Sequence, residues 1–350
     1  MIMRVAQRMI TRNYMRGLNN SLSNRAETLE RSASGLKFKK LSENVSDGTR
    51  AMRIQEERVR AEQQLNTVKS IQLEYNAIDS NLESIDDILQ SVQEKLLMAM
   101  NDSYGQTKKD VLAQEVAGIK EQLLKFSNAQ FGGKYLFSGT NNYEPPFRAD
   151  SGTGKVLFNG IPLEDVYKDS GKFYYNATPG DPSTKTLVPD SGDIYMDVGL
   201  GLRMENGEPD PRTAFLVSIS GIDMMGFGTG TTGSNGTAVA GNLYDLLTQV
   251  ENAMLTDDAD AMGDTHTQLV KLNDKMRMSR TELGVRANFL SRLEINMESN
   301  IDHLGELESN LISADPAEEA INMKMAEYVW LATLQLGNQI LPTSLLDFLR

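Results

Sequence analysis

The longest hydrophobic pattern in the chain runs from about residue 50 to residue 101, and it predicts one long helix. Apolar residues recur there at alternating steps of three and four. This is the spacing of a coiled-coil seam, because a 3.5-residue repeat keeps one stripe facing a partner helix. The stripe consists of Val68, Ile71, Tyr75, Ile78, Leu82, Ile85, Leu89, Val92, Leu96 and Ala99. Neither Pro nor Gly interrupts the run, so the seam requires a partner of similar length.

The second half of the chain supplies such a partner. Helical spacing returns near residue 240 as a short helix and continues as a long one over about residues 260–313. Arg286 and Asn300 fall on its stripe, where a polar residue can fix the register of a helix pair. The apolar positions are Leu269, Leu272, Met276, Leu283, Leu290, Leu293, Met297, Leu304, Leu307 and Leu311. The two long helices are therefore predicted to form an antiparallel coiled-coil rod.

A shorter helix is predicted directly after the first long one. Its apolar stripe runs from Leu112 to Phe126, and Thr107 is the candidate for its N-cap. Because only a short turn separates the two helices, they are predicted to form an antiparallel hairpin. Ser46 or Asp47 is the candidate N-cap of the long helix.

Both ends of the chain read as amphipathic helices that lack a core of their own. Residues 1–33 are rich in Asn and Ser, which are poor helix formers, and Arg25 interrupts their apolar stripe. A last helix begins near residue 317 and stops at Pro342. The apolar residues of the two ends are Leu18, Leu22, Leu29, Ile321, Met325, Tyr328, Leu345 and Phe348. We expect these ends to order only against neighbouring chains, because an isolated helix gains little without packing.

Between the helices, from about residue 134 to residue 240, the residue composition changes. Gly, Pro, Asp, Ser and Thr dominate, and short apolar runs at residues 135–137, 156–158, 173–175, 194–196 and 215–217 are strand candidates. This predicts three parts. Residues 1–45 and 312–350 form terminal assembly segments, residues 46–133 and 241–311 form a helical rod, and residues 134–240 form a small, mostly β outer domain. The predicted fold class is mainly α with a β insertion.

Composition agrees with long helices, since only 7% of the 350 residues are aromatic. A formal net charge of −13 argues against binding to nucleic acid or to anionic membranes. The chain has no cysteine, which excludes disulfides and thiolate metal sites. We find neither a cleavable signal peptide nor an apolar run of the roughly 18 residues that span a bilayer.

No set of residues predicts catalysis, a cofactor or a metal site. The two histidines, His266 and His303, are far apart and lack ligand partners at metal spacing. Residues 258–263 imitate a calcium loop, but Leu269 stands where a bidentate glutamate is needed. Residues 152–155 and 226–230 imitate phosphate loops without the full motif, so a hairpin tip and a linker are the simpler interpretations.

The two ends together resemble the bacterial flagellin family. Residues 29–46 read LERSASGLKFKKLSENVS, which is similar to the segment after the first flagellin helix. LGVRANFLSRLE from Leu283 and the closing SLLDFLR are similar to flagellin C-termini. FGGKYLFSGTNNYEPPF, at residues 131–147, resembles the members of this family that join the flagellar hook to the filament. One departure is ENVSDG at residues 43–48, where the family usually has a Pro-Ser-Asp-Asp-Pro-like sequence.

This resemblance implies a structural subunit of the bacterial flagellum, which is exported unfolded through the type III channel and uses no cofactor. The partners it implies are further copies of the chain, hook-associated protein 1, flagellin and an export chaperone on the C-terminal helix. It implies neither nucleic acid nor membrane as a partner. The alternative within the family is a flagellin that forms the filament itself. An enzyme carried in the β segment is an alternative from another class.

Overall fold

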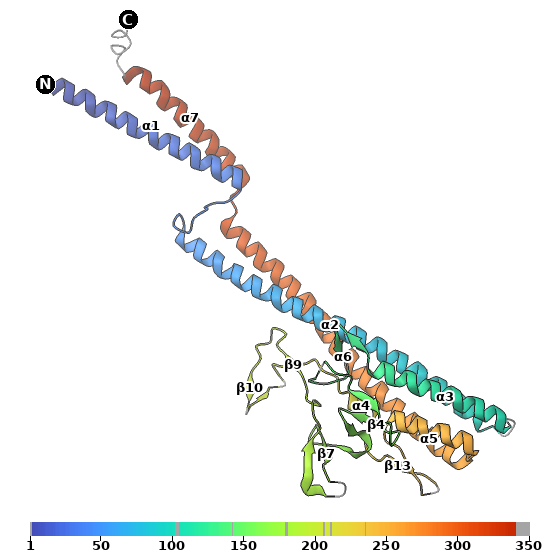
Figure 1. Ribbon diagram of the computed structural model, residues 1–350. Coiled ribbons are helices and arrows are strands. Elements are labelled where there is room, and N and C mark those ends of the chain that lie inside the picture. Colours follow the sequence, from blue (N-terminus) through green and yellow to red (C-terminus); the bar gives the residue numbers. More distant parts are fainter. Residues whose placement is uncertain are drawn as a thin grey trace. The chain divides into compact units, whose positions relative to one another are not determined.

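A computed structural model describes residues 2–340, except residues 102–104, 142, 179–180, 206, 211 and 235. The fold is mainly α with a β insertion (Figure 1). Its helices are α1 (Ile2–Ser34), α2 (Val45–Ala99), α3 (Gln106–Ser127), α4 (Gly221–Met225), α5 (Leu243–Thr256), α6 (Ala259–Ile312) and α7 (Pro316–Ile340). The chain divides into two compact units. We call Met1–Glu62 with Glu298–Arg350 the terminal unit, and Gln63–Met297 the central unit.

Helices α2 and α6 run antiparallel, as the ion pairs between them show. In the central unit, Arg280 Nε lies 2.6 Å from Asp79 Oδ1 and Arg277 Nε lies 2.9 Å from Asp86 Oδ1. Residue numbers thus fall along α6 as they rise along α2. In the terminal unit the same order brings Arg58 Nε to 3.1 Å from Glu308 Oε2. The predicted antiparallel pairing of the two long helices is therefore confirmed in both units.

The core of the central unit follows the predicted seam. Residues Val68 to Ala99 of the α2 stripe are all buried, together with Leu269, Met276, Leu283 and Leu290 of α6. Helices α3 and α5 add Ala113, Val116, Leu123, Leu246, Leu247 and Val250 to the same cluster. Four helices thus close around one apolar interior, which covers the α2 seam on more sides than α6 alone could.

Two of the predicted helix caps are wrong. Helix α2 begins one residue before Ser46, and Asn44 is its cap. The Asn44 Oδ1 accepts from the Asp47 amide at 3.1 Å, which satisfies one backbone donor of the first turn. The Asn44 Nδ2 also donates to the Asp47 carboxylate at 2.8 Å. Helix α3 has Gly105 at its N-cap with no side-chain cap, so Thr107 does not serve there.

Residues 130–239 contain short antiparallel strands in small sheets. One sheet contains β3 (Phe147–Ala149), β4 (Val156–Phe158) and β5 (Ile161–Pro162), and another contains β6 (Val166–Asp169), β7 (Lys172–Asn176) and β8 (Lys185–Leu187). The remaining pairs are β1 (Gln130–Phe131) with β2 (Lys134–Tyr135), β9 (Tyr195–Met196) with β12 (Phe215–Leu216), β10 (Met204–Glu205) with β11 (Glu208–Pro209), and β13 (Thr231–Thr232) with β14 (Ala238–Val239). Each of the five predicted strand runs overlaps one of these strands.

The β segment shares its interior with the helices. Phe137, Phe147 and Phe158 are buried in the same cluster as the α2 seam. Tyr75 of α2 makes a direct link, because its hydroxyl donates to the Leu216 carbonyl at 2.6 Å and its ring lies 6.1 Å from the Phe215 ring. The β segment therefore lies in one compact unit with residues 63–133 and 241–297 of the rod, and the division into separate domains stays a prediction.

The glycine-rich run at residues 226–230 is a turn that packs backbone against backbone. A Cβ on Gly241 would lie 2.6 Å from the Phe227 carbonyl oxygen, and a Cβ on Gly226 would lie 2.5 Å from the Gly241 carbonyl oxygen. Gly226 and Asn242 also form a β-bridge. This turn holds the end of the β segment on the start of α5, which explains the glycines without a phosphate ligand.

Replacing Gly241 with Ala should lower the free energy of unfolding by about 1–3 kcal/mol, because the added methyl group overpacks a backbone contact. Gly118→Ala is the matched control. Gly118 lies within α3, where a Cβ would have nothing within 4 Å, so the same change there should stabilise the helix by about 0.5–1 kcal/mol. Urea denaturation of both variants measures the difference, and equal effects would contradict the packing described.

Replacing Tyr75 with Phe should lower the free energy of unfolding by about 1 kcal/mol at neutral pH, because the Leu216 carbonyl loses its donor. Burial raises the pKa of Tyr75 to about 12 in the folded chain, against about 10 for an unperturbed tyrosine. The unfolded chain therefore loses this proton first, and the stability that the neutral hydroxyl supplies declines as the pH rises from about 10 to about 12. Urea titrations from about pH 8 to about pH 11 should show a smaller decline in Tyr75→Phe, and an equal decline would refute this assignment.

Candidate functional site

The terminal helices α1 and α7 lie side by side in the terminal unit (Figure 1). Their contact is largely polar and aromatic. The Arg25 guanidinium stands 4.4 Å from the centre of the Trp330 ring, and Arg31 Nε lies 3.6 Å from Glu319 Oε2. A Cβ on Gly337 would meet the Tyr14 hydroxyl, so a larger residue there would require the Tyr14 side chain to move where these two helices come close. Arg25, which breaks the apolar stripe in the sequence, thus belongs to the contact with α7.

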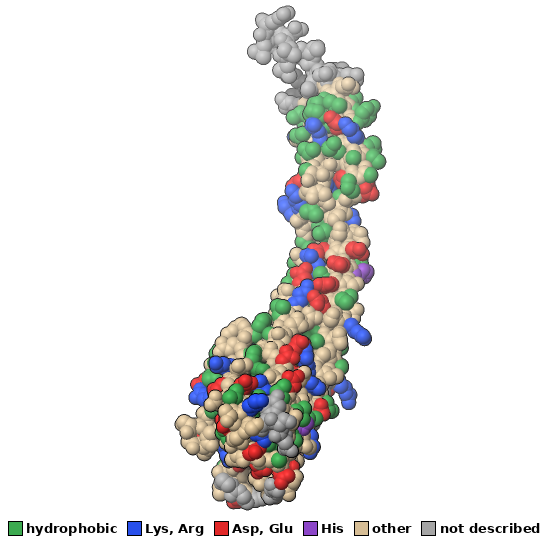
Figure 2. All heavy atoms as spheres, turned by 90° about the vertical axis from the view of Figure 1, so that its right-hand side faces the viewer, with side chains coloured by type: hydrophobic (Ala, Val, Ile, Leu, Met, Phe, Trp, Pro, Cys, Tyr) green, Lys and Arg blue, Asp and Glu red, His purple; other side chains and the backbone are tan. Residues whose placement is uncertain are grey.

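This polar contact leaves large apolar side chains facing outward on both helices. Of the predicted interface residues, Leu22 is 51% exposed, Leu29 57%, Ile321 65%, Met325 64% and Tyr328 75%, whereas Leu18 is half-buried. Met15, Val329 and Leu336 are exposed beside them. Figure 2 shows apolar side chains spread over the terminal helices on one face of the molecule. Leu345 and Phe348 lie outside the described residues.

An outward apolar surface of this kind is unusual for a chain that works alone. Single exposed apolar residues are ordinary, but a row along two adjacent helices marks a surface for another protein. The exposed residues recur at helical spacing, so each helix presents a stripe that a second helix can cover. The arrangement can bind a helical partner.

The predicted rod residues fall into two groups. On α2 the structure brings together Val68, Ile71, Tyr75, Ile78, Leu82, Ile85, Leu89, Val92 and Leu96, all of them buried. On α6 the burial is uneven. Leu304 is buried, Leu293 and Met297 are half-buried, and Leu307 is 39% exposed. The α2 stripe is covered by several helices, whereas Leu304 and Leu307 belong to the terminal unit, which contains neither α3 nor α5.

The two polar residues predicted on the α6 stripe differ in their surroundings. Arg286 is half-buried, bonds Glu282 within α6 and also bonds Tyr75 of the α2 stripe, whereas Asn300 is exposed. Gln268 and Asn273, two amides of α6 that sequence reasoning missed, are buried. Sequence reasoning also missed the pairing of Arg277 and Arg280 with Asp79 and Asp86. The sequence does show acidic residues beside the α2 stripe and arginines beside the α6 stripe. Assigning each arginine to its acid, however, requires the register of the two helices.

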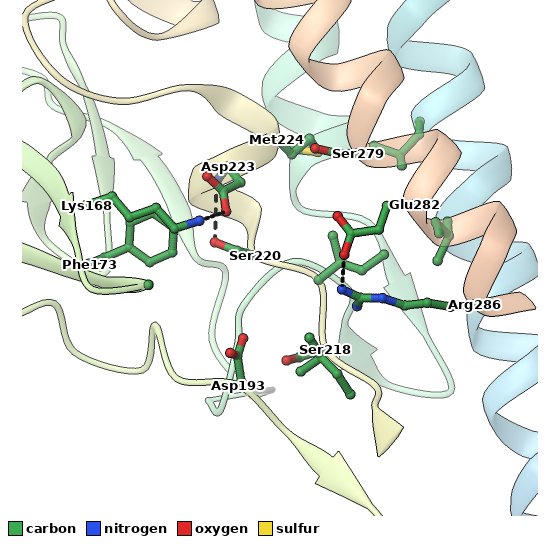
Figure 3. A pocket seen from close by; sticks show the side chains of 15 residues that line it. Lys168, Phe173, Asp193, Ser218, Ser220, Asp223, Met224, Ser279, Glu282 and Arg286 are labelled. Carbon is green, nitrogen blue, oxygen red and sulfur yellow. Dashed lines mark hydrogen bonds and ion pairs between the residues drawn. The ribbon is translucent and has the colours of Figure 1, made fainter. Parts of the chain in front are cut away.

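A cavity of about 190 Å³ lies in the central unit between α6 and the β segment (Figure 3). Its two cations are each paired with a carboxylate of the same lining. Lys168 Nζ lies 2.8 Å from Asp223 Oδ2, and Arg286 is paired with Glu282. Desolvation raises the pKa of the Asp193 carboxyl, which faces the same space. The cavity is thus a polar space between α6 and the β segment, lined by two ion pairs and the Asp193 carboxyl.

The described residues offer neither a metal site nor a membrane span. Within them, no group of three or more His, Asp or Glu side chains is placed to hold a metal ion. None of the helices, over the residues described, combines the length and the apolar character needed to cross a lipid bilayer.

Comparison with known proteins agrees with this picture. Residues 5–142 match the family model described as the bacterial flagellin N-terminal helical region. Flagellar hook-associated protein 3 of Escherichia coli strain K12 is 24% identical over 303 residues, which cover 83% of this chain and 82% of that protein.

Solved structures show the same fold. The crystal structure of Bacillus cereus FlgL aligns with a TM-score of 0.50 and 14% identity, over 73% of this chain and 99% of that one. The crystal structure of Xanthomonas campestris FlgL in space group C2 aligns with a TM-score of 0.51 and 14% identity, over 74% and 99%. The chain is thus similar to the bacterial flagellin family over its N-terminal helical region, and to flagellar hook-associated protein 3 over most of its length.

Proposed function

We propose that this chain is a structural subunit of the bacterial flagellum that joins the hook to the filament, and that it has no enzymatic activity. The observation that carries the proposal is the outward apolar surface of α1 and α7. A subunit whose terminal helices keep uncovered stripes is completed by its neighbours. The similarity to flagellar hook-associated protein 3 supports the place of those neighbours in the hook region.

The partners follow from this arrangement. Copies of the chain pack α1 and α7 against one another, with hook-associated protein 1 on one side of the assembly and flagellin on the other. Contacts of this head-to-tail kind are heterologous, so they build open stacks. The parts proposed from the sequence fit this role. Residues 1–45 and 312–350 form the assembly segment, residues 46–133 and 241–311 the rod, and residues 134–240 the part that faces solvent.

Secretion through the flagellar type III channel is part of the same proposal, as is an export chaperone that binds the C-terminal helix. Terminal helices that order only against neighbours suit such a route, because the subunit reaches its site before it can polymerise. The chain would then be extracellular, in the flagellum.

The alternative within the family is a flagellin that forms the filament. The match to the flagellin N-terminal helical region fits both roles. The curated relative named for the hook favours the junction. Copy number per flagellum separates the two, since a junction needs few copies and a filament needs many.

Replacing Ile321, Met325 and Tyr328 together with Ser should abolish attachment to the hook without unfolding the central unit. These side chains are exposed in the single chain, so their loss removes a surface for neighbours and little internal packing. The measurement is electron microscopy of a strain that lacks the native gene and carries the variant. We expect hooks without filaments and unpolymerised flagellin in the medium.

Lys324→Ser is the matched control, because Lys324 is an exposed residue on the same face of the helix, three residues after Ile321 and four before Tyr328, but is charged and not apolar. It should support normal filaments. Filaments of normal length and number in the triple variant would contradict the role assigned to α7.

A further inference from the structure

Four helix ends meet at one place in the terminal unit. Helix α1 ends at Ser34 and α2 begins at Val45, while α6 ends at Ile312 and α7 begins at Pro316. The two connections, residues 35–44 and residues 313–315, are far apart in the sequence but adjacent in space. Each connects one helix of the α1/α7 pair to one helix of the α2/α6 pair.

Backbone hydrogen bonds join these two connections directly. Leu36 and Ser313 form an antiparallel β-bridge. The Lys37 amide donates to the Ile312 carbonyl at 2.8 Å, and the Ala314 amide donates to the Gly35 carbonyl at 2.8 Å. We call this bridge the clasp. The Lys37 ammonium adds a bond to the Asn310 carbonyl at 2.7 Å.

The first connection is held in shape on its own side. Gly35 has a φ of +69°, which turns the chain out of α1 at a cost that only glycine avoids. Further along, Phe38 and Leu41 lie against Gly48 in the first turns of α2. The Lys39 ammonium bonds Glu30 of α1 at 2.6 Å, and the Lys39 amide bonds Glu43 at 3.0 Å.

The second connection is held by the start of α7. The Asp315 carboxylate accepts from the Ala317 amide at 2.8 Å, which caps the helix after Pro316. One turn further, the largely buried Glu319 reaches Arg31 in the last turn of α1. The clasp thus lies between an anchored end of α1 and an anchored start of α7.

From this geometry we infer that the clasp couples the ordering of α1 to the ordering of α7. When a neighbour orders one terminal helix, its end of the clasp is fixed, and the other helix starts from a fixed point. The inference adds a mechanism to the proposed assembly role, but it concerns one chain and can be tested without a hook. A coupling of this kind is reciprocal, so fixing the clasp by any means should order both helices.

The chain has no cysteine, which permits a clean test. Leu36 and Ser313 are opposed with the clasp hydrogen bonds flanking them, so they are a non-hydrogen-bonded pair. Such pairs have Cα atoms about 4.5 Å apart, within the range that a disulfide bridges. The double variant Leu36→Cys with Ser313→Cys should therefore form a disulfide within one chain under oxidising conditions.

Hydrogen exchange of the purified full chain, oxidised and reduced, gives the readout. The disulfide lies just after α1 and just before α7, so it fixes the point from which each of the two helices begins. We expect amides in both α1 and α7 to exchange at least tenfold more slowly in the oxidised variant, with no change in α5. The reduced form of the same variant is the internal control, and Ala33→Cys with Ser313→Cys is the displaced control, which should give no such protection.

Three results would overturn the inference. The disulfide fails to form, so the two connections do not meet as described. The disulfide forms while neither α1 nor α7 gains protection, which shows that the clasp does not order the helices. A disulfide that protects only one of the two helices shows that the clasp does not couple them. Failure of the proposed assembly role would appear in a different experiment, as normal filaments in the variant that replaces Ile321, Met325 and Tyr328 with Ser.

Discussion

The apolar seam of α2 can be covered only by another helix of similar length, and this requirement shapes the chain. At 1.5 Å per residue a helix of 55 residues is about 80 Å long, far longer than a compact core of ordinary size. Helix α6, with 54 residues, is the partner that matches it. Because the pairing is antiparallel, the start of α2 meets the end of α6. The chain therefore enters α2 and leaves α6 at the same place, where α1 and α7 become neighbours.

The same requirement is met in the central unit and left open in the terminal unit. In the first, α3, α5 and the β segment close over the α2 stripe, so Leu82, Leu89 and Leu96 are buried. In the second, α1 and α7 make their contact through Arg25 with Trp330 and through Arg31 with Glu319. Their apolar residues remain outside. The requirement that apolar stripes be covered thus explains both the buried core of the central unit and the exposed apolar surface of α1 and α7. Neighbouring subunits are expected to bind at that exposed surface.

The sequence predicts the elements well where one periodicity covers many turns. The α2 stripe is buried at each position, because its spacing repeats without a break. The five strand runs each overlap a strand, but the run at residues 135–137 shares only Tyr135 with β2. The errors fall where a local choice depends on a neighbour in space. Asn44 replaces Ser46 or Asp47 as a cap, and Gln268 and Asn273 are buried amides of α6 that sequence reasoning missed. Leu307 shares the spacing of Leu304 but is 39% exposed, since spacing alone cannot say how many helices surround a position.

The central claim is that α1 and α7 are completed by neighbours, and amide hydrogen exchange tests it most directly. The measurement compares the full chain in dilute solution with the same chain in isolated flagella. The account predicts fast exchange over α1 and α7 in solution, strong protection of the same amides after assembly, and protection of the α2 seam in both states. Terminal helices that were already protected in the free chain, to the same extent as in flagella, would contradict it.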